Sequence, residues 1–171
     1  MADLIIFGAG DIAELASFYF THDTDHRVAA FTVDGTFLKE SQFCGLPVVA
    51  LEDVAAGFEP GRDRAFVALS YGKVNALRQE KCATMRELGY ELETYVSSRA
   101  TTFSDLSVGW NCFILEDNTI QPRTRIGNNV TLWSGNHIGH HSTIEDNVFI
   151  SSHVVVSGGV VVGANSFLGV N

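Results

Sequence analysis

Four of the six histidines of this 171-residue chain gather in its second half. They are His137, His140, His141 and His153. A free imidazole titrates near pH ~6.5, so a neutral histidine placed beside a bound nucleophile can act as a general base. Imidazoles also bind zinc, and a metal site made from these histidines and shared between subunits is a second interpretation. Solvated surface histidines without a chemical role are a third.

A glycine turn near the N-terminus is the second feature with chemical meaning. Gly8 and Gly10 follow the apolar run Asp3–Phe7, a predicted buried strand, and Ala13 lies in the segment of helical spacing that comes next. Small residues let the backbone approach a phosphate, and the first turn of a helix offers free N–H groups. A tight strand–helix turn that binds nothing explains the same residues.

Asp34 follows the second predicted strand, Val28–Val33, where its carboxylate could accept a hydrogen bond from a ribose hydroxyl. The candidate substrate-binding residues are Gly8, Gly10, Asp11, Asp34 and Tyr71. An NAD-dependent reaction is disfavoured, because this part of the chain is long enough for only one of the two halves that a dinucleotide usually bridges.

The elements that would position these residues differ between the two halves of the chain. Further strands are predicted at Leu46–Val49, Ala65–Leu69 and Leu92–Val96, and helices at Leu51–Ala56 and Lys73–Leu88. Alternation of strands and helices favours a parallel sheet. We therefore predict that residues 1–100 form a small α/β domain, a Rossmann-like half of the nucleotide-binding type. The polar linker Ser97–Thr102 marks its end.

From Val108 onward an aliphatic residue occupies every sixth position. The series is Val108, Ile114, Ile120, Ile126, Leu132, Ile138, Ile144, Ile150, Val156, Val162 and Leu168. A period of six fits neither a helix nor a lone strand, but it is typical of a hexapeptide β-helix, whose short strands wind round a triangular prism. Three hexads make one coil, so residues eighteen apart stack. We predict a left-handed parallel β-helix over residues 101–171; a β-sandwich with accidental spacing is the alternative.

Crowding inside such a prism constrains other positions of the hexad. The residue four places after the aliphatic one also points inward, and at Asn118 and Asn136 we expect a ladder of stacked amides. A glycine directly follows the aliphatic residue in five hexads, where we expect the backbone to need conformational freedom. These glycines are Gly109, Gly127, Gly139, Gly163 and Gly169. His140 and His141 are the third and fourth residues of their hexad, which puts them at a corner, pointing away from the core.

Composition argues against several classes of protein. The net charge is −9 and no basic stripe occurs, so nucleic-acid binding is disfavoured and a bound phosphate must be held by local N–H groups. No secretory signal is evident, and no apolar run approaches the ~18 residues that cross a bilayer. Three distant cysteines without a CxxC motif indicate a reduced, cytoplasmic protein with no cysteine metal site.

Three segments together resemble the bacterial sugar O-acyltransferase family, which includes sialic acid O-acetyltransferases and nucleotide-sugar N-acetyltransferases. They are Leu4–Gly10, Gly135–Ile144 and Phe167–Asn171. Many acyltransferases share the hexad array, but the array joined to a small N-terminal α/β domain is more specific. The resemblance covers essentially the whole chain.

The resemblance implies a homotrimer that transfers an acetyl group from acetyl-CoA to a hydroxyl or amine of a sugar, often one linked to a nucleotide. The N-terminal domain would hold the nucleotide, and CoA would lie between neighbouring β-helices. The family's histidine motif falls on Ile138–Ile144, which makes His140 the base, with His141 beside it as a second catalytic candidate. The candidate CoA-binding residues are Phe149, Ser157, Gly158, Gly159 and Gly169. Phe149 and Trp133 could equally be subunit contacts.

The chain departs from the family pattern in three places. His141 stands where relatives usually carry Asp or Glu to orient the base. Either another carboxylate substitutes, from this chain or from a neighbouring subunit, or no carboxylate orients the base; the candidates are Glu116, Asp117, Glu145 and Asp146. Asp11-Ile12 replaces a pair that includes a histidine contact to the acceptor. The chain stops just inside a fourth coil, where relatives continue, and is therefore expected to be a fragment.

The sequence thus predicts an acetyl-CoA-dependent sugar N- or O-acetyltransferase that uses a histidine general base and direct transfer. Its partners would be a nucleotide sugar and acetyl-CoA, with no nucleic acid, no membrane insertion and no metal. The alternatives are a non-catalytic protein, either nucleotide-sugar-binding or a scaffold, and a zinc-dependent β-helix enzyme.

Overall fold

The computed structural model describes residues 2–170; Met1 and Asn171, the last residue of the third family-like segment, lie outside the described residues. The chain divides into two compact units, residues 1–70 with 80–93, and residues 71–79 with 94–171. The second unit begins before the boundary predicted near residue 100, because Tyr95 and Val96 already pair with one of its strands. Within residues 2–170, no helix combines the length and the apolar character needed to cross a membrane.

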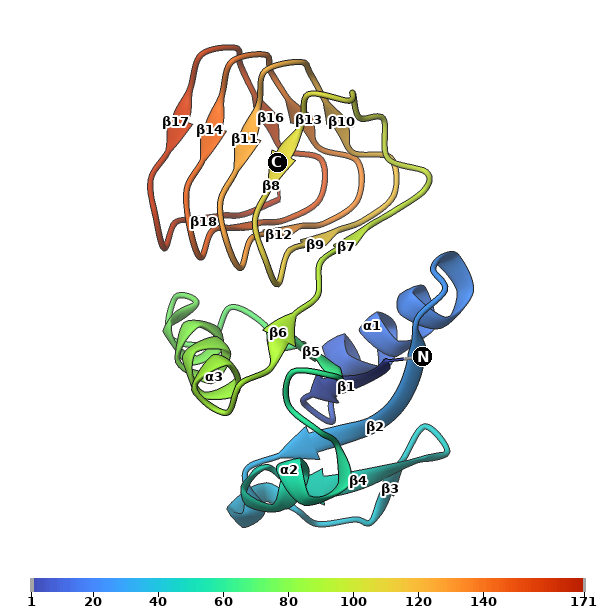
Figure 1. The fold of residues 1–171 in the computed structure, drawn as a ribbon. Helices are drawn as coiled ribbons and strands as arrows, with labels where there is room; N and C mark the ends of the chain where they lie inside the picture. The colour runs from blue at the N-terminus through green and yellow to red at the C-terminus, as the bar shows by residue number, and fades with distance from the viewer. Residues whose placement is uncertain (1, 171) are drawn as a thin grey trace. The chain divides into compact units, whose positions relative to one another are not determined.

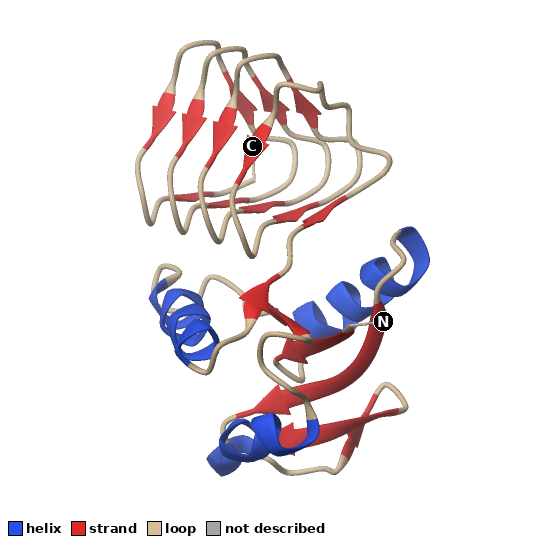
Figure 2. Ribbon diagram, in the orientation of Figure 1, coloured by secondary structure: helices blue, strands red, loops and turns tan. Residues whose placement is uncertain are grey.

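The first unit contains a six-stranded sheet in the order β3-β4-β2-β1-β5-β6. The strands are β1 (Asp3–Phe7), β2 (Arg27–Val33), β3 (Gln42–Phe43), β4 (Leu46–Ala50), β5 (Arg64–Val67) and β6 (Glu91–Leu92). Neighbours are parallel except β3 and β4, which form an antiparallel hairpin. The helices are α1 (Asp11–Asp23), α2 (Val54–Gly57) and α3 (Ala76–Glu87), with 3-10 turns at Gly35–Phe37 and Leu51–Asp53. Figures 1 and 2 show α1 beside β1 and β2.

The core of the first unit forms where apolar strand residues meet helices. Leu4, Ile5 and Ile6 of β1 are fully buried, and Phe20 of α1 packs edge-on against Phe66 of β5 with ring centroids 5.1 Å apart. The parallel sheet predicted from strand–helix alternation is confirmed by the parallel pairing of its strands. The single strand predicted at Leu92–Val96 is wrong: β6 pairs with β5, whereas β7 (Tyr95–Val96) pairs with a strand of the second unit.

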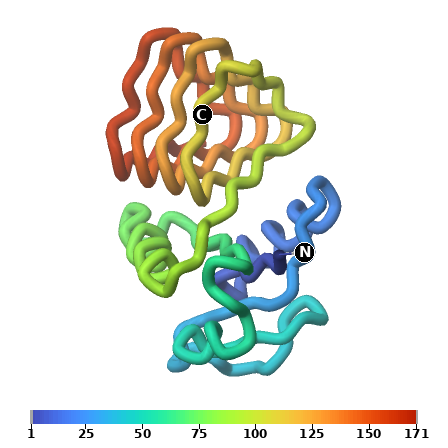
Figure 3. The backbone as a smooth tube through the Cα atoms, viewed as in Figure 1, coloured from blue at the N-terminus to red at the C-terminus, as the bar shows by residue number. Residues whose placement is uncertain are grey.

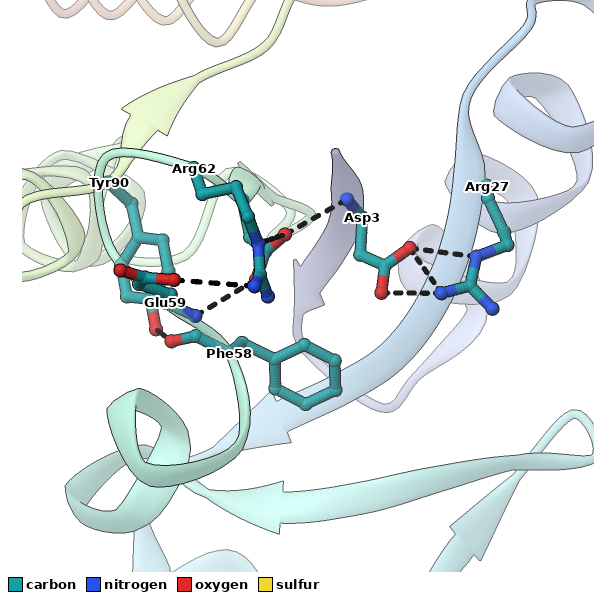
Figure 4. Close-up of polar contacts among 7 residues, drawn as sticks. Asp3, Arg27, Phe58, Glu59, Arg62 and Tyr90 are labelled. Carbon is teal, nitrogen blue, oxygen red and sulfur yellow. Dashed lines mark hydrogen bonds and ion pairs between the residues drawn. The ribbon is translucent and has the colours of Figure 1, made fainter. Parts of the chain in front are cut away.

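A buried carboxylate organises the loop before β5. Asp63 is 1% exposed and accepts the backbone N–H groups of Asp3 at 3.1 Å and Glu59 at 2.9 Å. The Arg62 guanidinium donates to it at 2.7 Å, and this bond first, helped by the two backbone bonds, outweighs the cost of burial and lowers the pKa of Asp63 to about 2. Figure 4 shows Arg62 beside Glu59, and the Asp3 carboxylate turned toward Arg27.

From Tyr95 onward the chain winds into stacked coils of short strands (Figure 3). They are β7, β8 (Ser107–Val108), β9 (Phe113–Ile114), β10 (Thr119–Ile120), β11 (Arg125–Ile126), β12 (Thr131–Leu132), β13 (His137–Ile138), β14 (Thr143–Ile144), β15 (Phe149–Ile150), β16 (Val155–Val156), β17 (Val161–Val162) and β18 (Phe167–Leu168). Three sheets result: β7-β9-β12-β15-β18, β10-β13-β16 and β8-β11-β14-β17. Each pair is parallel and joins residues eighteen apart, as in Ile120 with Ile138, which confirms a parallel β-helix.

The core of the second unit consists of the residues that the period of six selects. From Ile114 to Val162 the aliphatic residues of the series are at most 8% exposed, while Val108 and Leu168, near the two ends of the coils, are partly buried. The second inward position is also buried, for example at Cys112 and Val130. Both inward positions were therefore predicted correctly.

Each corner turns through a residue in the left-handed backbone region. The positive-φ positions recur every six residues: Asn111, Asp117, Arg123, Asn129, Gly135, His141, Asn147, His153, Gly159 and Asn165. Asn, Asp, His and Gly tolerate this region best, which explains why they dominate the corners. We expected a need for backbone freedom at the glycines that follow the aliphatic residues. The residues that need it are instead these corner positions.

Those other glycines are explained by close approach of successive coils. A Cβ at Gly139 would lie 2.5 Å from the carbonyl carbon of Ser157, and one at Gly109 would lie 2.6 Å from the oxygen of Gly127. The predicted need for backbone freedom was therefore wrong, since steric room is what demands glycine there. Gly163 and Gly169 have space for a Cβ, so neither reason applies to them.

The expected amide ladder at Asn118 and Asn136 does not form. Both side chains are buried, but they bond to backbone: Asn118 Nδ2 donates to the oxygens of Leu115 and Trp133, each at 2.9 Å, and Asn136 Nδ2 donates to Trp133 at 2.5 Å. Each amide thus donates to a carbonyl three residues earlier and caps the turn of its own corner.

A ladder does form at the left-handed corner positions. Asn111 Nδ2 donates to Asn129 Oδ1, and Asn129 Nδ2 donates to Asn147 Oδ1, both at 2.9 Å. Arg78, 1% exposed, adds bonds from Nε to Asn129 Oδ1 at 2.9 Å and from Nη2 to the Asn129 carbonyl at 3.0 Å. This buried network fastens segment 71–79 to the coils.

Candidate active site

His140 and His141 lie at the corner that joins β13 to β14. Both side chains are exposed, while Ile138 and Ser142 on either side of them are buried. His141 is the left-handed residue of this corner, with a φ of 59°. The prediction that the pair points away from the core is thus confirmed.

The two imidazoles contact each other. Nδ1 of His140 lies 3.0 Å from Nδ1 of His141, and the rings are perpendicular with centroids 5.2 Å apart. A hydrogen bond between these atoms requires a proton on one nitrogen and a lone pair on the other. When His140 is the donor, its Nε2 retains a lone pair, which is the form that a general base needs.

Neighbouring coils hold His140 in place. Gln121 Oε1 accepts its backbone N–H at 2.9 Å, and the N–H of Gly159 donates to its carbonyl at 2.8 Å. The ring lies against Gly158, where a Cβ would come within 2.7 Å of both Cε1 and Nε2. The sequence analysis missed Gln121, although its place one coil before Gly139 makes it a neighbour of this corner.

An N–H group without an acceptor lies beside the His140 ring. At two equivalent corner positions a side chain nineteen residues earlier accepts this N–H: Gln121 does so for His140, and Glu145 does so for Ala164 at 2.9 Å. At Trp110 and Asn128 the acceptor is instead the side chain eighteen residues later. The corresponding residue for Gly158 is Gly139, which has no side chain. The Gly158 N–H accordingly makes no hydrogen bond within the described part of the chain.

The carboxylates proposed to orient the base are engaged elsewhere in this chain. Glu116 accepts the Ser134 hydroxyl at 2.8 Å, Asp146 accepts the Asn128 N–H at 2.7 Å, and Glu145 bonds Ala164. Asp117 is an exposed left-handed corner residue. The side chain that contacts His140 Nδ1 is that of His141.

The remaining two histidines of the cluster lie apart from this pair. His137 is half-buried on β13, and the ring of His153 covers Gly135, where a Cβ would lie 2.6 Å from its Nδ1. Among residues 2–170, no three His, Cys, Asp or Glu side chains are grouped so as to hold a metal ion.

The candidate CoA-binding residues separate into two groups. Ser157, Gly158 and Gly159 form the exposed corner of the coil that follows His140, and Gly169 is exposed after β18. Phe149 is only 3% exposed.

Phe149 is covered by segment 71–79. Its ring lies 5.2 Å from Tyr71 and 5.6 Å from Phe167, with the Arg78 guanidinium 5.8 Å away. This burial argues against the predicted contact of Phe149 with pantetheine. Tyr71 is half-exposed and belongs to this aromatic cluster of the second unit, whereas the other candidate substrate-binding residues belong to the first unit.

In the first unit, Gly8, Gly10 and Asp11 line one depression of about 480 Å³, together with Ala68–Ser70. Gly8 has a φ of 126°, and a Cβ there would come within 2.8 Å of the Ala68 oxygen, so the turn requires glycine. A Cβ at Gly10 would meet nothing within 4 Å. Three of the five predicted substrate-binding residues are therefore brought together.

Asp34 is not among the residues that line this depression. Lys81 donates to its Oδ1 at 2.7 Å, an ion pair that the sequence analysis missed. Burial lowers the pKa of Lys81, but the hydrogen bond and charge of Asp34 outweigh it, so the pKa is raised overall. A ribose hydroxyl at Asp34 would share the carboxylate with this lysine.

Sequence comparison finds no matching family model and no significantly similar curated protein. Solved structures match the fold. A variant of perosamine N-acetyltransferase from Caulobacter crescentus, in complex with CoA and GDP-perosamine, matches 98% of this chain and 77% of its own, with a TM-score of 0.86 and 21% identity. The acetyltransferase domain of PglB from Neisseria gonorrhoeae matches 100% and 93%, with a TM-score of 0.74 and 15% identity. WeeI from Acinetobacter baumannii matches 94% and 74%, with a TM-score of 0.64 and 16% identity.

This chain shares its fold with perosamine N-acetyltransferase, the PglB acetyltransferase domain and WeeI. The fold that the resemblance implied for the second unit is confirmed, including the parallel coils that present His140 and His141.

Proposed function

We propose that the chain is an acetyl-CoA-dependent acetyltransferase acting on an amino or hydroxyl group of a nucleotide-linked sugar. The strongest support is the exposed His140, whose Nδ1 is engaged by His141 while its ring lies against Gly158. The fold is shared with N-acetyltransferases solved with CoA and GDP-perosamine or with acetyl coenzyme A. Together these observations favour the enzyme over a non-catalytic scaffold.

The chemistry would be a direct transfer. Nε2 of His140 accepts the proton of the sugar amine or hydroxyl as that atom attacks the thioester carbonyl. A bond forms from nitrogen or oxygen to the acetyl carbon, the carbon–sulfur bond breaks, and the proton passes from His140 to the departing thiolate. Nδ1 of His141 accepts a hydrogen bond from the Nδ1–H of His140, which favours the tautomer of His140 whose Nε2 carries the lone pair.

The Gly158 N–H is our candidate for stabilising the transition state. Charge develops on the carbonyl oxygen during attack, and a fixed N–H group without a competing acceptor stabilises it. Gly158 presents such a group beside the imidazole because Gly139 has no side chain to engage it. The two glycines thus acquire different roles: Gly139 leaves the donor available, and Gly158 leaves room for the ring.

The other assignments follow the same division of the chain. We assign the pantetheine arm to Ser157, Gly158 and Gly159 and to Gly169, with CoA between neighbouring β-helices of a homotrimer. Phe149 is left out of this assignment because it is buried. We assign the nucleotide to a Rossmann-like first unit. Support for this comes from the depression at Gly8–Asp11 and from an adjoining one of about 270 Å³, which shares Ala9 and includes the aromatic rings of Phe37 and Phe43.

Thiol release from acetyl-CoA with a panel of amino and hydroxy nucleotide sugars tests the proposal. His140→Asn should lower kcat by about 10²–10⁴-fold, the usual contribution of a general base. His153→Asn is the matched control. His153 lies at an exposed left-handed corner twelve residues after His141, so the variant should keep wild-type kcat. Unchanged kcat in His140→Asn would remove this histidine from the mechanism. Nucleotide binding without thiol release for any acceptor would favour a non-catalytic binding protein.

A further inference from the structure

A groove of about 380 Å³ runs along the coils on the His141 side of the corner. Its lining residues are Asp105, Ser107, Arg123, Thr124, Arg125, His141 and Thr143. The eighteen-residue repeat generates it: Ser107, Arg125 and Thr143 stack on one face through β8, β11 and β14. Asp105, Arg123 and His141 stack in the same way along the adjoining corner, since they are also eighteen apart.

The groove holds two cationic side chains with no acidic partner. Within residues 2–170, the guanidinium groups of Arg123 and Arg125 make neither an ion pair nor a hydrogen bond to the protein. Elsewhere in this acidic chain arginines are paired, as in Arg27 with Asp3 and Arg64 with Glu91. Asp105 is the one carboxylate in the groove, and its Oδ2 accepts the backbone N–H of Arg123 at 2.8 Å. The groove therefore has an excess of positive charge.

The position of this charge identifies which ligand it suits. His141 lines the groove, and its Nδ1 lies 3.0 Å from Nδ1 of His140. An anion that contacts His141 in the groove would thus be separated from the proposed base by a single imidazole ring, that of His141. The phosphates of CoA are separated from the thioester by the whole pantetheine arm, whereas a charged group on the acceptor is at most one sugar ring from the reacting atom.

We infer that Arg123 and Arg125 bind an anionic group of the acceptor, either a carboxylate on the sugar or the diphosphate at its anomeric carbon; this inference rests on the acetyltransferase function proposed above. A planar guanidinium pairs with carboxylate or phosphate through two hydrogen bonds, so either group suits the pair. The depression at Gly8–Asp11 offers no arginine or lysine side chain for such a pair, because Asp11 is its single charged lining residue.

The direct test measures binding of simple anions to the whole chain at low salt. The probes are inorganic pyrophosphate and glucuronate, with glucose as the neutral control, and the readouts are calorimetry and the histidine ring resonances in NMR spectra. One of the two anions should bind and shift the His141 signals, and R123Q/R125Q should weaken that binding at least ~10-fold. Preference for pyrophosphate identifies a diphosphate, and preference for glucuronate identifies a sugar carboxylate.

Two further variants keep this test interpretable. R99Q removes an exposed arginine of the coils that does not line the groove and should bind the anion as the wild type does. R125K keeps the charge and should retain more binding than R125Q. Equal binding by wild type and R123Q/R125Q, or no binding of either anion to the folded wild type, would overturn the inference.

Kinetics separate this inference from the proposed function. Once an acceptor is found, R123Q/R125Q should raise its KM at least ~10-fold while changing kcat less than ~3-fold, because the arginines bind the acceptor without touching the reacting atoms. Acetyl transfer with unchanged KM in that variant would contradict the arginine site and leave the enzyme assignment intact. Anion binding that depends on the arginines, without acetyl transfer to any acceptor, would support the arginine site and contradict the enzyme assignment.

Discussion

The imidazole of His140 lies against the Cα of Gly158, eighteen residues further along the chain, so closely that a Cβ on Gly158 would come within 2.7 Å of Cε1 and Nε2. The spacing of one coil is therefore what brings the proposed base and the glycine together. It also makes the geometry of the base sensitive to a single methyl group.

Gly158→Ala should lower kcat by roughly 10–100-fold, since the new Cβ must displace the ring and small misplacements of catalytic groups are costly. Gly163→Ala is the control, because a Cβ there has 4.0 Å of clearance from its nearest neighbour, Glu145. Steady-state thiol release and thermal unfolding of both variants check this. Full activity in a folded Gly158→Ala would show that the ring position is not critical.

The contact between His140 and His141 predicts that His141 assists the proposed base. Its Nδ1 can accept a hydrogen bond from the Nδ1–H of His140, which favours the form of His140 whose Nε2 carries the lone pair. Removing the acceptor at position 141 should therefore lower kcat.

His141→Asn and His141→Ala test this role. Asparagine suits the left-handed backbone at this position and keeps an oxygen acceptor, whereas alanine has none. His141→Asn should lose about 10-fold or less in kcat, and a folded His141→Ala should lose more. Equal kcat in the wild type and in both variants would exclude His141 from orienting the base.

The asparagine ladder should matter for stability rather than for activity. Asn129 is fully buried and bonds Asn111, Asn147 and Arg78, so Asn129→Ala should cost about 2–4 kcal/mol, from lost hydrogen bonds and a left-handed alanine.

Asn165→Ala is the matched control for this ladder, because it has the same backbone conformation on an exposed corner and should cost only ~1 kcal/mol. Urea unfolding compares the two variants. Equal losses would mean that the ladder adds nothing beyond the corner conformation.

Asp63 predicts acid sensitivity of the first unit. Its pKa is lowered to about 2, first by the Arg62 hydrogen bond, so its ionised form stabilises the fold in full above the ordinary aspartate pKa near ~3.9. This contribution should be lost progressively as the pH falls from ~4 toward ~2.

Asp63→Asn should therefore be less stable than the wild type at pH 7 by about 1–3 kcal/mol, with the difference shrinking below pH ~4. Asp53→Asn, at an exposed site, should show no such pH-dependent difference. Thermal unfolding between pH 2 and 7 measures both. A pH-independent difference for Asp63→Asn would assign its effect to shape rather than charge.

Much of the second unit could be predicted from the sequence because a six-residue period is a local property. Burying one aliphatic residue per hexad places Ile138 inside, and the corner position of His140 and His141 follows by counting. The glycine turn before α1 was recognisable for the same reason, since the strand, the turn and the helix are adjacent in the chain.

Contacts between coils and between distant segments needed the tertiary structure. Several contacts depend on which way each corner side chain turns, and hydrophobic periodicity does not encode that direction. They are the hydrogen bond between Gln121 and His140, the packing of the His140 ring against Gly158, and the ladder through Asn129. Phe149 is buried by segment 71–79, and Asp34 pairs with Lys81. In both cases the contacting residues lie dozens of positions apart in the chain. Only the packed chain, where exclusion of water and hydrogen-bond geometry select among many alternatives, determines such pairs.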